Sequence, residues 1–503
     1  MGELCTKVKS ATRRMLYPAA FLLAVESAYL WFQGRSGAEA FFLISLGTCL
    51  VVGVWSVGAI GLPLLPLVAV QALVIYGLPI AVGHDVLNDY RPAYILKAGE
   101  ELLIFDLAMV LSWGFFMRAI HPSPPISYAL DELKLEDSNA WKRMGFALVI
   151  ASTGYATLDA FNYAGPLVSL LPSGSSSIFA ALVAIASMIG FFLVSLALGT
   201  GKTSAFGKLA FWCLLILNAM IASKDFLLSS AASSLIAVAV GFFWSNGRMP
   251  VIYLTVTLLS LSFLNTGKTT MRERYWSNDP EPMTAVTARS LPDIYLEWIE
   301  ASYYAVIENE SASPERDTSG GGAAQHKNQT LLDRVDNLQN LLFVIDAEDS
   351  GHIEPLHGAT YSVIPALLVP RILVPNKPRS HEGQVILNVH FGRQDLYSTF
   401  TTYIAWGLLP EAYGNFGPVA GSVIIGAFLG GLFAWIENLT ARKLFISVEG
   451  FLALCLLLHF LNSSEMVASV LVTAIFQSLI VIAAASIPFA RRTVAPRHPE
   501  RMS

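Results

Sequence analysis

The sequence predicts an all-α polytopic membrane protein with about 12 transmembrane helices. Hydrophobic residues make up 54% of the 503 residues, charged residues only 14%, and the mean hydropathy is +0.55. A helix needs roughly 20 apolar residues to cross about 30 Å of hydrocarbon, and apolar runs of this length recur along the chain. This composition excludes an ordinary soluble enzyme and nucleic-acid binding.

The predicted spans follow the apolar runs in order, and the turn residues Gly61 and Pro63 divide the long run 41–83 into two helices. The basic start of the chain resembles a signal peptide, but no small-residue cleavage site follows, so the first run is expected to remain as a helix. The spans cover residues 15–33, 39–59, 63–83, 100–120, 143–163, 176–199, 207–224, 229–245, 249–266, 416–437, 443–463 and 465–489.

The distribution of Lys and Arg predicts the orientation of these spans. With both termini in the cytoplasm, seventeen basic residues fall on the inside, and four fall in the short outside loops. The other eleven lie in the long segment 267–415, which the positive-inside rule exempts because of its length. We therefore expect this segment to be an outer loop between spans 9 and 10 of a multi-pass membrane protein.

Three segments follow from this topology. Residues 1–266 are expected to form a nine-helix scaffold, 267–415 the outer loop, and 416–503 three C-terminal spans with a cytoplasmic tail. Within the loop, 308–328 is polar and rich in Gly and Ser, which is typical of a linker. Helical periodicity flanks it, over 291–302 and 331–342, and predicts either interfacial amphipathic helices or a cap on the bundle.

The polar residues of the chain concentrate in 361–417, which we interpret as the site of any chemistry. Its basic residues suit phosphate oxygens, because guanidinium groups bind them in a bidentate fork and Lys adds a point charge. Prolines between them stiffen the backbone and argue against one continuous helix. Contacts with lipid head groups or acidic loops would explain the same residues. The set is Arg371, Lys377, Arg379 and Arg393.

Carboxylates and histidines of the same segment are candidates for a general base. Glu411 follows Pro410 just before a span, where partial desolvation would raise its pKa towards neutrality. The alternative is a carboxylate that only stabilises a helix N-terminus. His390 is the second candidate base.

Metal and cofactor sites are not expected. His352 and His357 are five residues apart, but no cysteine and no HExxH helix accompanies them. The four cysteines lie in predicted spans or the N-terminal tail, and no nucleotide-binding motif occurs. Glu26, Asp106 and Asp159 fall within predicted spans, where an ionisable residue lines a polar path or makes a structural pair.

Two motifs in this segment resemble the Wzy-type O-antigen and oligosaccharide repeat-unit polymerases of bacteria. PRILVPNKP begins at Pro370 and holds Arg371 and Lys377. GLLPEAYGNFGPVAG follows and holds Glu411, Tyr413 and Asn415. The local similarity covers about sixty residues, and the order of spans with a late outer loop agrees with it over the whole chain.

The resemblance implies a glycosyltransferase of the GT-C type in a bacterial inner membrane, with the loop 267–415 in the periplasm. It would act on polyprenyl-diphosphate-linked oligosaccharides at the periplasmic face without metal or nucleotide. The growing chain would be transferred to the distal hydroxyl of a new repeat unit, which yields O-antigen, capsule or exopolysaccharide. Implied partners are membrane lipids, a chain-length regulator and a flippase. Arg371, Lys377, Arg379, Arg393, Tyr413 and Asn415 would bind the substrate, and Glu411, His390 and Arg371 would be catalytic.

Three other functions fit the same sequence. An O-antigen-ligase-like transferase would differ only in its acceptor. Twelve spans with both termini inside also match a transporter or flippase of lipid-linked sugars, although the halves of the chain show no repeat. The third possible function is that of a non-catalytic lipid-binding subunit of an export complex.

Overall fold

In the computed structural model, every regular element of the described residues is helical. The structure describes residues 2–119, 138–170, 176–201, 203–246, 249–275, 291–311, 336–351, 353–369, 373–374, 376–400, 404–441, 448–462 and 466–493. The chain divides into two compact units, 1–136 with 336–503 and 137–335. The all-α prediction is therefore confirmed for these residues.

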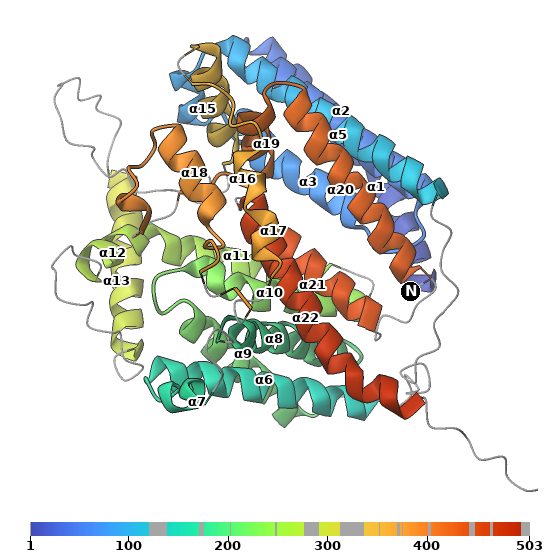
Figure 1. Cartoon of the computed structure of the whole chain (residues 1–503), viewed down its shortest axis with the longest axis vertical. Helices are drawn as coiled ribbons and strands as arrows, with labels where there is room; N and C mark the ends of the chain where they lie inside the picture. The colour runs from blue at the N-terminus through green and yellow to red at the C-terminus, as the bar shows by residue number, and fades with distance from the viewer. Residues whose placement is uncertain are drawn as a thin grey trace, which may run out of the picture. The chain divides into compact units, whose positions relative to one another are not determined.

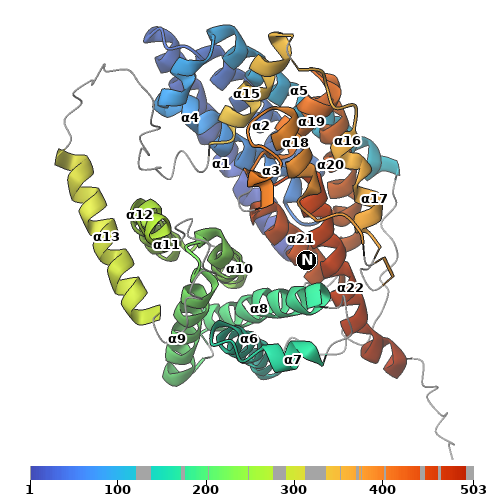
Figure 2. The ribbon, with the colours of Figure 1, turned by 60° about the vertical axis from the view of Figure 1, so that its left-hand side comes forward.

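The first unit carries both ends of the chain (Figures 1 and 2). The predicted break of the run 41–83 falls at Gly61 and Pro63, and a π-helical turn (Leu73–Gly77) joins α3 to α4. The helices before the second unit are α1 (Gly2–Phe32), α2 (Ala38–Gly58), α3 (Leu64–Ala72), α4 (Leu78–Val82) and α5 (Pro92–Ala119). Those after it are α15 (Leu338–Asp349), α16 (Ala359–Ser362), α17 (Ile364–Leu367), α18 (Glu382–His390), α19 (Leu408–Phe416), α20 (Ala420–Thr440), α21 (Val448–Asn462) and α22 (Ala468–Thr493).

Helices α5 and α20 form the most extensive contact of this unit, and they run side by side in Figure 1. Glycines of α20 allow the backbones to touch. A Cβ on Gly426 would lie 2.5 Å from the carbonyl oxygen of Phe105, and one on Gly430 would collide with that of Met109. Close backbone approach of this kind is a usual way for membrane helices to associate.

The carboxylate of Glu437 connects α20 to the α2–α3 turn. It accepts hydrogen bonds from the indole nitrogens of Trp55 (3.3 Å) and Trp113 (2.9 Å). It also accepts bonds from the backbone amides of Ile60 (2.7 Å) and Gly61 (3.1 Å). A buried carboxylate is tolerated when its oxygens are satisfied in this way, so Glu437 fixes the turn that separates the two spans.

The second unit contains α6 (Ser138–Ala160), α7 (Gly165–Ser169), α8 (Ser176–Gly199), α9 (Ala205–Ala222), α10 (Leu228–Asn246), α11 (Val251–Thr266), α12 (Lys268–Tyr275) and α13 (Leu291–Ser311). Helix α13 realises the predicted periodicity, because Leu291, Tyr295, Trp298 and Ser302 form its buried face. The Trp298 indole donates to the carbonyl of Leu264 at 2.7 Å. The buried face packs against α11.

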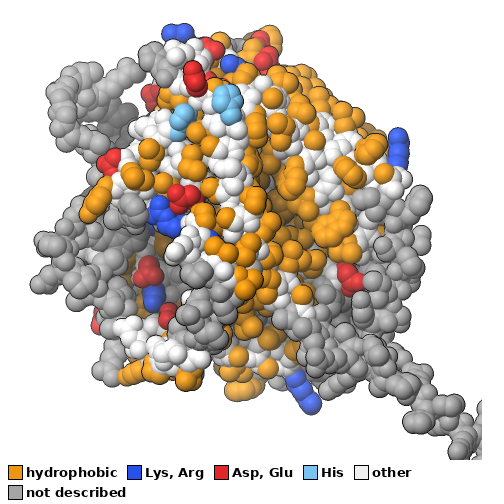
Figure 3. All heavy atoms as spheres, in the orientation of Figure 1, with side chains coloured by type: hydrophobic (Ala, Val, Ile, Leu, Met, Phe, Trp, Pro, Cys, Tyr) orange, Lys and Arg blue, Asp and Glu red, His pale blue; other side chains and the backbone are white. Residues whose placement is uncertain are grey.

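Seven helices in the described part of the chain are long and apolar enough to cross a membrane, or up to eight if the bent pair α11–α12 is one span. Figure 3 shows the matching surface, a broad apolar area over α20 that includes exposed Ile424, Phe428 and Trp435. The chain is thus a multi-pass membrane protein by this criterion. The other predicted spans form α6, α10, α11, α21 and α22, which are shorter or more polar, and the number twelve stays a prediction.

Candidate functional site

The polar segment 361–417 folds as short helices, as its prolines predict. Helix α16 ends at Ser362, α17 ends at Leu367, and α18 begins at Glu382. Helix α19 lies between Gly407 (φ 93°) and Gly417 (φ 74°), both in the left-handed region that favours glycine. These elements surround the start of α22, with α16, α17 and α18 in contact with it.

Glu411 lies at the centre of this arrangement and is completely buried. Its Oε1 accepts a hydrogen bond from the hydroxyl of Thr360 on α16 at 2.7 Å. Its Oε2 accepts one from the backbone amide of Ala468 at 2.6 Å. Asn415 donates to both the Thr360 hydroxyl (2.9 Å) and the Glu411 carbonyl (2.7 Å). The predicted site residues Glu411 and Asn415 therefore belong to one network.

The Ala468 amide is the first N–H of α22 and has no acceptor within that helix. Glu411 thus stabilises the N-terminus of α22 rather than only that of its own helix. Helix α18 approaches closely, since a Cβ on Gly383 would lie 2.9 Å from the Ser469 hydroxyl and 3.6 Å from Glu411 Oε1. Ser469 donates to the carbonyl of Ser380 at 2.9 Å.

Burial raises the pKa of Glu411 to about 7, and its bonds from Ala468 and Thr360 oppose that rise. Desolvation disfavours the charged form, whereas donors to the carboxylate favour it. The Glu411 carboxyl is therefore protonated more readily than that of a solvent-exposed glutamate.

The predicted basic residues have separate partners. Lys377 donates to the carbonyls of Leu367 (3.1 Å) and Val369 (2.9 Å) after α17. Arg379 pairs with Glu382 at 3.3 Å. Arg371 lies outside the described residues. No contact joins Lys377 or Arg379 to Glu411 within the part of the chain that the structure describes.

Arg393 is held differently from the other basic residues. Its guanidinium lies 4.5 Å from the ring centroid of Phe343 and 5.1 Å from that of Trp406. It donates to the Asn340 side-chain oxygen at 2.6 Å, and within the described residues it has no ion pair. Burial lowers the pKa of Arg393, with the nearby Tyr90 opposing this. A rigid, partly desolvated cation of this kind can bind an anionic oxygen.

His390 ends α18 with its side chain exposed. Its Nε2 lies 2.7 Å from the carbonyl oxygen of Glu354. A carbonyl only accepts, so Nε2 carries the proton, and Nδ1 has the free lone pair in the neutral ring. This geometry leaves His390 able to accept a proton from solvent or substrate.

Tyr413 reveals a second polar cluster that sequence reasoning missed. Its hydroxyl is buried and, among the described residues, has no hydrogen-bond partner. Lys97 Nζ lies 6.0 Å from the centre of its ring. Burial raises the pKa of Glu348 to about 7, with Lys97 lowering it and Glu101 raising it. The weak sequence signal for this cluster was the pair Lys97 and Glu101, which lie one helical turn apart on α5.

Glu101 closes this cluster from α5. Its carboxylate accepts bonds from the Val419 amide (2.8 Å) and from the Ser422 hydroxyl at the start of α20. Both polar clusters thus contact residues of α19 or the turn that follows it. Among the described residues no group of three His, Cys, Asp or Glu could hold a metal ion, and His352 lies outside them.

The three acids in predicted spans lie on different helices. Glu26 is half-buried on α1, and Asp159 is exposed on α6. Asp106 is buried on α5 against α2, where a Cβ on Gly47 would lie 2.6 Å from its Oδ2. Its Oδ1 has no partner among the described residues.

No protein-family model, curated protein or solved structure matches this chain. The family resemblance of the motifs therefore remains a prediction. What is shown is an all-helical, multi-pass membrane fold with two buried polar clusters around α19.

Proposed function

We propose that this protein is a membrane glycosyltransferase that polymerises polyprenyl-diphosphate-linked oligosaccharide repeat units. The observation that carries the proposal is Arg393, a cation packed against two aromatic rings without a carboxylate partner among the described residues. It lies in the segment that resembles the Wzy-type polymerases, in a multi-pass fold that suits a lipid-linked substrate. The proposal includes twelve spans, cytoplasmic termini and a periplasmic site in a bacterial inner membrane.

In the proposed reaction, a hydroxyl of the incoming repeat unit attacks the anomeric carbon of the growing chain. The new glycosidic bond forms as the bond to the diphosphate breaks, and polyprenyl diphosphate leaves with its electron pair. Arg371, Lys377, Arg379 and Arg393 stabilise the charge on the leaving group. The acceptor proton passes to His390 Nδ1. A single direct displacement inverts the anomeric centre.

Glu411 takes a positioning role in this proposal, because both of its carboxylate oxygens are occupied and the side chain is buried. It holds α16, α19 and the start of α22 in one arrangement. Asn415 supports it through Thr360. Tyr413 is as buried as Glu411, and its hydroxyl has no partner among the described residues, so we propose that this hydroxyl contacts substrate only when α19 becomes accessible.

A second candidate is a transporter or flippase of lipid-linked sugars. Asp106 favours it, since an ionisable side chain buried in a span without a partner for Oδ1 among the described residues is typical of ion-coupled transport. An O-antigen-ligase-like transferase uses the same donor chemistry and differs in the acceptor.

One reconstitution distinguishes these functions. The purified protein is placed in liposomes with polyprenyl-diphosphate-linked repeat units, and the glycans are separated by size. A polymerase gives a ladder of longer chains. A single transfer product indicates a ligase, and movement of the lipid across the bilayer without new glycan indicates a flippase. Either of the last two results would exclude polymerisation.

A further inference from the structure

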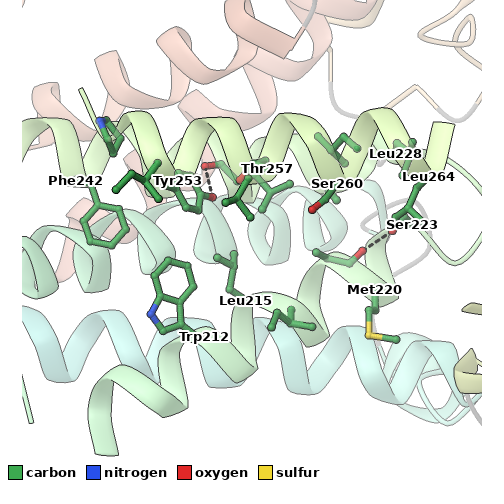
Figure 4. A pocket seen from close by; sticks show the side chains of 18 of the residues that line it. Trp212, Leu215, Met220, Ser223, Leu228, Phe242, Tyr253, Thr257, Ser260 and Leu264 are labelled. Atoms are coloured by element: carbon green, nitrogen blue, oxygen red, sulfur yellow. Dashed lines mark hydrogen bonds between the residues drawn. The ribbon is translucent and has the colours of Figure 1, made fainter. Parts of the chain in front are cut away.

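A large cavity lies within the second unit, between α9, α10 and α11, with Tyr295 of α13 at its wall. Its volume is about 1330 Å³. Figure 4 shows apolar side chains from opposite walls that face this space, among them Trp212, Leu215, Phe242 and Leu264. Neither the proposed reaction nor the polar clusters of the first unit use it.

Three of the polar side chains at the cavity wall have partners inside the protein. The hydroxyls of Ser223 and Tyr295 lie 2.7 Å apart, and Tyr295 donates to the carbonyl of Met220 at 3.0 Å. The Tyr253 hydroxyl donates to the carbonyl of Leu235 at 2.9 Å. No charged side chain lines the cavity among the described residues. The wall is therefore mainly hydrocarbon and offers no charge to a charged ligand.

Helix α11 shows what medium surrounds the cavity. Residues 251–266 contain no charged side chain, and α11 is apolar on its outer side as well as on the cavity side. Leu258 and Leu259 do not line the cavity and are 61% and 64% exposed. A helix that is apolar all round lies in lipid when it is not buried in protein. The cavity, which lies on the other side of α11, therefore adjoins an apolar environment.

We infer that this cavity binds the acyl chains of a bilayer phospholipid. At roughly 30 Å³ for each methylene-sized group, its volume holds on the order of forty such groups, enough for both chains of one lipid. Because the wall recognises hydrocarbon alone, the occupant is the most abundant lipid of the bilayer. The inference rests on the membrane fold and is independent of the glycosyltransferase proposal.

One segment of the chain, the connection between α12 and α13, is an unsuitable occupant by its composition. Residues 276–290 connect α12 to α13, but they include Asp279, Glu281 and Arg289. Burying these charges in an apolar cavity without partners would cost far more than the contacts return.

Photo-crosslinking tests the inference. The full chain is reconstituted in nanodiscs with a phospholipid that carries a diazirine at mid-chain, irradiated, and mapped by peptide mass spectrometry. Bulk lipid labels Leu258 and Leu259 in any case. Acyl chains in the cavity also label Leu215 and Ala231, which line it and are only 3% and 2% exposed. Labelling of the outer face alone would overturn the inference.

A variant in which a larger side chain fills part of the cavity provides the matched comparison for the labelling experiment. Ala219→Phe occupies space at the wall and is expected to reduce labelling at Leu215 at least two-fold, with labelling at Leu259 unchanged. Leu209→Phe on the same helix is the control, since Leu209 is 62% exposed and does not line the cavity. Ala231→Leu replaces Ala219→Phe if the latter does not elute as folded protein. Equal labelling at Leu215 in the cavity variant and the control contradicts the inference.

Competition between lipids identifies which lipid supplies the bound hydrocarbon chain. Unlabelled phospholipid is expected to displace the probe from Leu215 in proportion to its mole fraction. If polyprenyl phosphate at one-tenth of that fraction displaces the probe instead, the occupant is an isoprenoid lipid, and the phospholipid inference is wrong.

Discussion

The carboxylate of Glu411 accepts a hydrogen bond from the backbone amide of Ala468, which lies 57 residues later in the chain, at 2.6 Å. This bond fixes the start of α22 on α19, and the bond from Thr360 fixes α16 on the same carboxylate. Three helices, α16, α19 and α22, therefore depend on one buried side chain. A motif glutamate can be required for activity through this packing, without touching a substrate.

Glu411→Gln is expected to destabilise the protein by about 1–3 kcal/mol, the usual cost of leaving a buried polar group unsatisfied. Both the Ala468 N–H and the Thr360 hydroxyl donate to the Glu411 carboxylate. In the Gln variant the side-chain NH₂ replaces one of the two accepting oxygens, so one of these donors faces another donor. Thermal unfolding in detergent measures the loss. Glu354→Gln, at an exposed side chain, is the control and should leave the midpoint unchanged.

Stability is expected to depend on pH through Glu411. Burial raises the folded-state pKa of Glu411 to about 7 from an ordinary value of 4.5, so the folded protein binds the proton more tightly than the unfolded chain. The stabilisation is complete below about pH 4.5 and is lost as pH rises through 7, about 3 kcal/mol in all. Unfolding midpoints at pH 5.5 and 7.5 measure the effect. An unchanged pH dependence in Thr360→Val would contradict the network, because this variant removes one donor to the carboxylate.

Arg393→Lys is expected to reduce ladder formation at least ten-fold, since an ammonium cannot keep the planar contact with Phe343 and Trp406 while bonding Asn340. The measurement is the rate of chain extension at saturating substrate and at one-tenth of that concentration. Arg35→Lys, which alters an exposed arginine of the first unit, serves as the control. Full activity of Arg393→Lys would remove Arg393 from the diphosphate site.

Tyr413→Phe separates a substrate role from a packing role. The Tyr413 hydroxyl has no hydrogen-bond partner among the described residues, so its removal should leave stability unchanged or raise it by up to about 1 kcal/mol. Activity should nevertheless fall if that hydroxyl binds substrate. Tyr295→Phe is the matched comparison and should lower stability by about 1 kcal/mol, because the Tyr295 hydroxyl bonds the carbonyl of Met220. Unchanged activity in Tyr413→Phe would assign Tyr413 to packing.

Gly426→Ala is expected to separate α5 from α20 and to lower the yield of folded protein. The added Cβ meets the carbonyl oxygen of Phe105 at 2.5 Å, which requires the backbones to move apart. Gly114→Ala on α5 has no neighbour within 4 Å and should be neutral or stabilising by about 0.4–1 kcal/mol. Fluorescence-detected size-exclusion chromatography compares the two, and equal profiles would contradict the close contact.

The sequence by itself determined the helical class, the multi-pass membrane character and the break at Gly61 and Pro63. Long apolar runs and helix-breaking residues act locally, so their effect can be read without a fold. The buried face of α13 was predictable for the same reason, since Leu291, Tyr295 and Trp298 repeat at helical spacing.

The tertiary structure alone decided how the polar residues are used. It placed Thr360 and Ala468 on the Glu411 carboxylate, Asn340 and two rings around Arg393, and Glu348 beside Lys97 and Tyr413. These partners are separated by tens to hundreds of residues, and short-range periodicity carries no information about such distances. A hydrogen bond or a desolvated charge depends on which surfaces pack together, and only the folded chain brings those surfaces into contact.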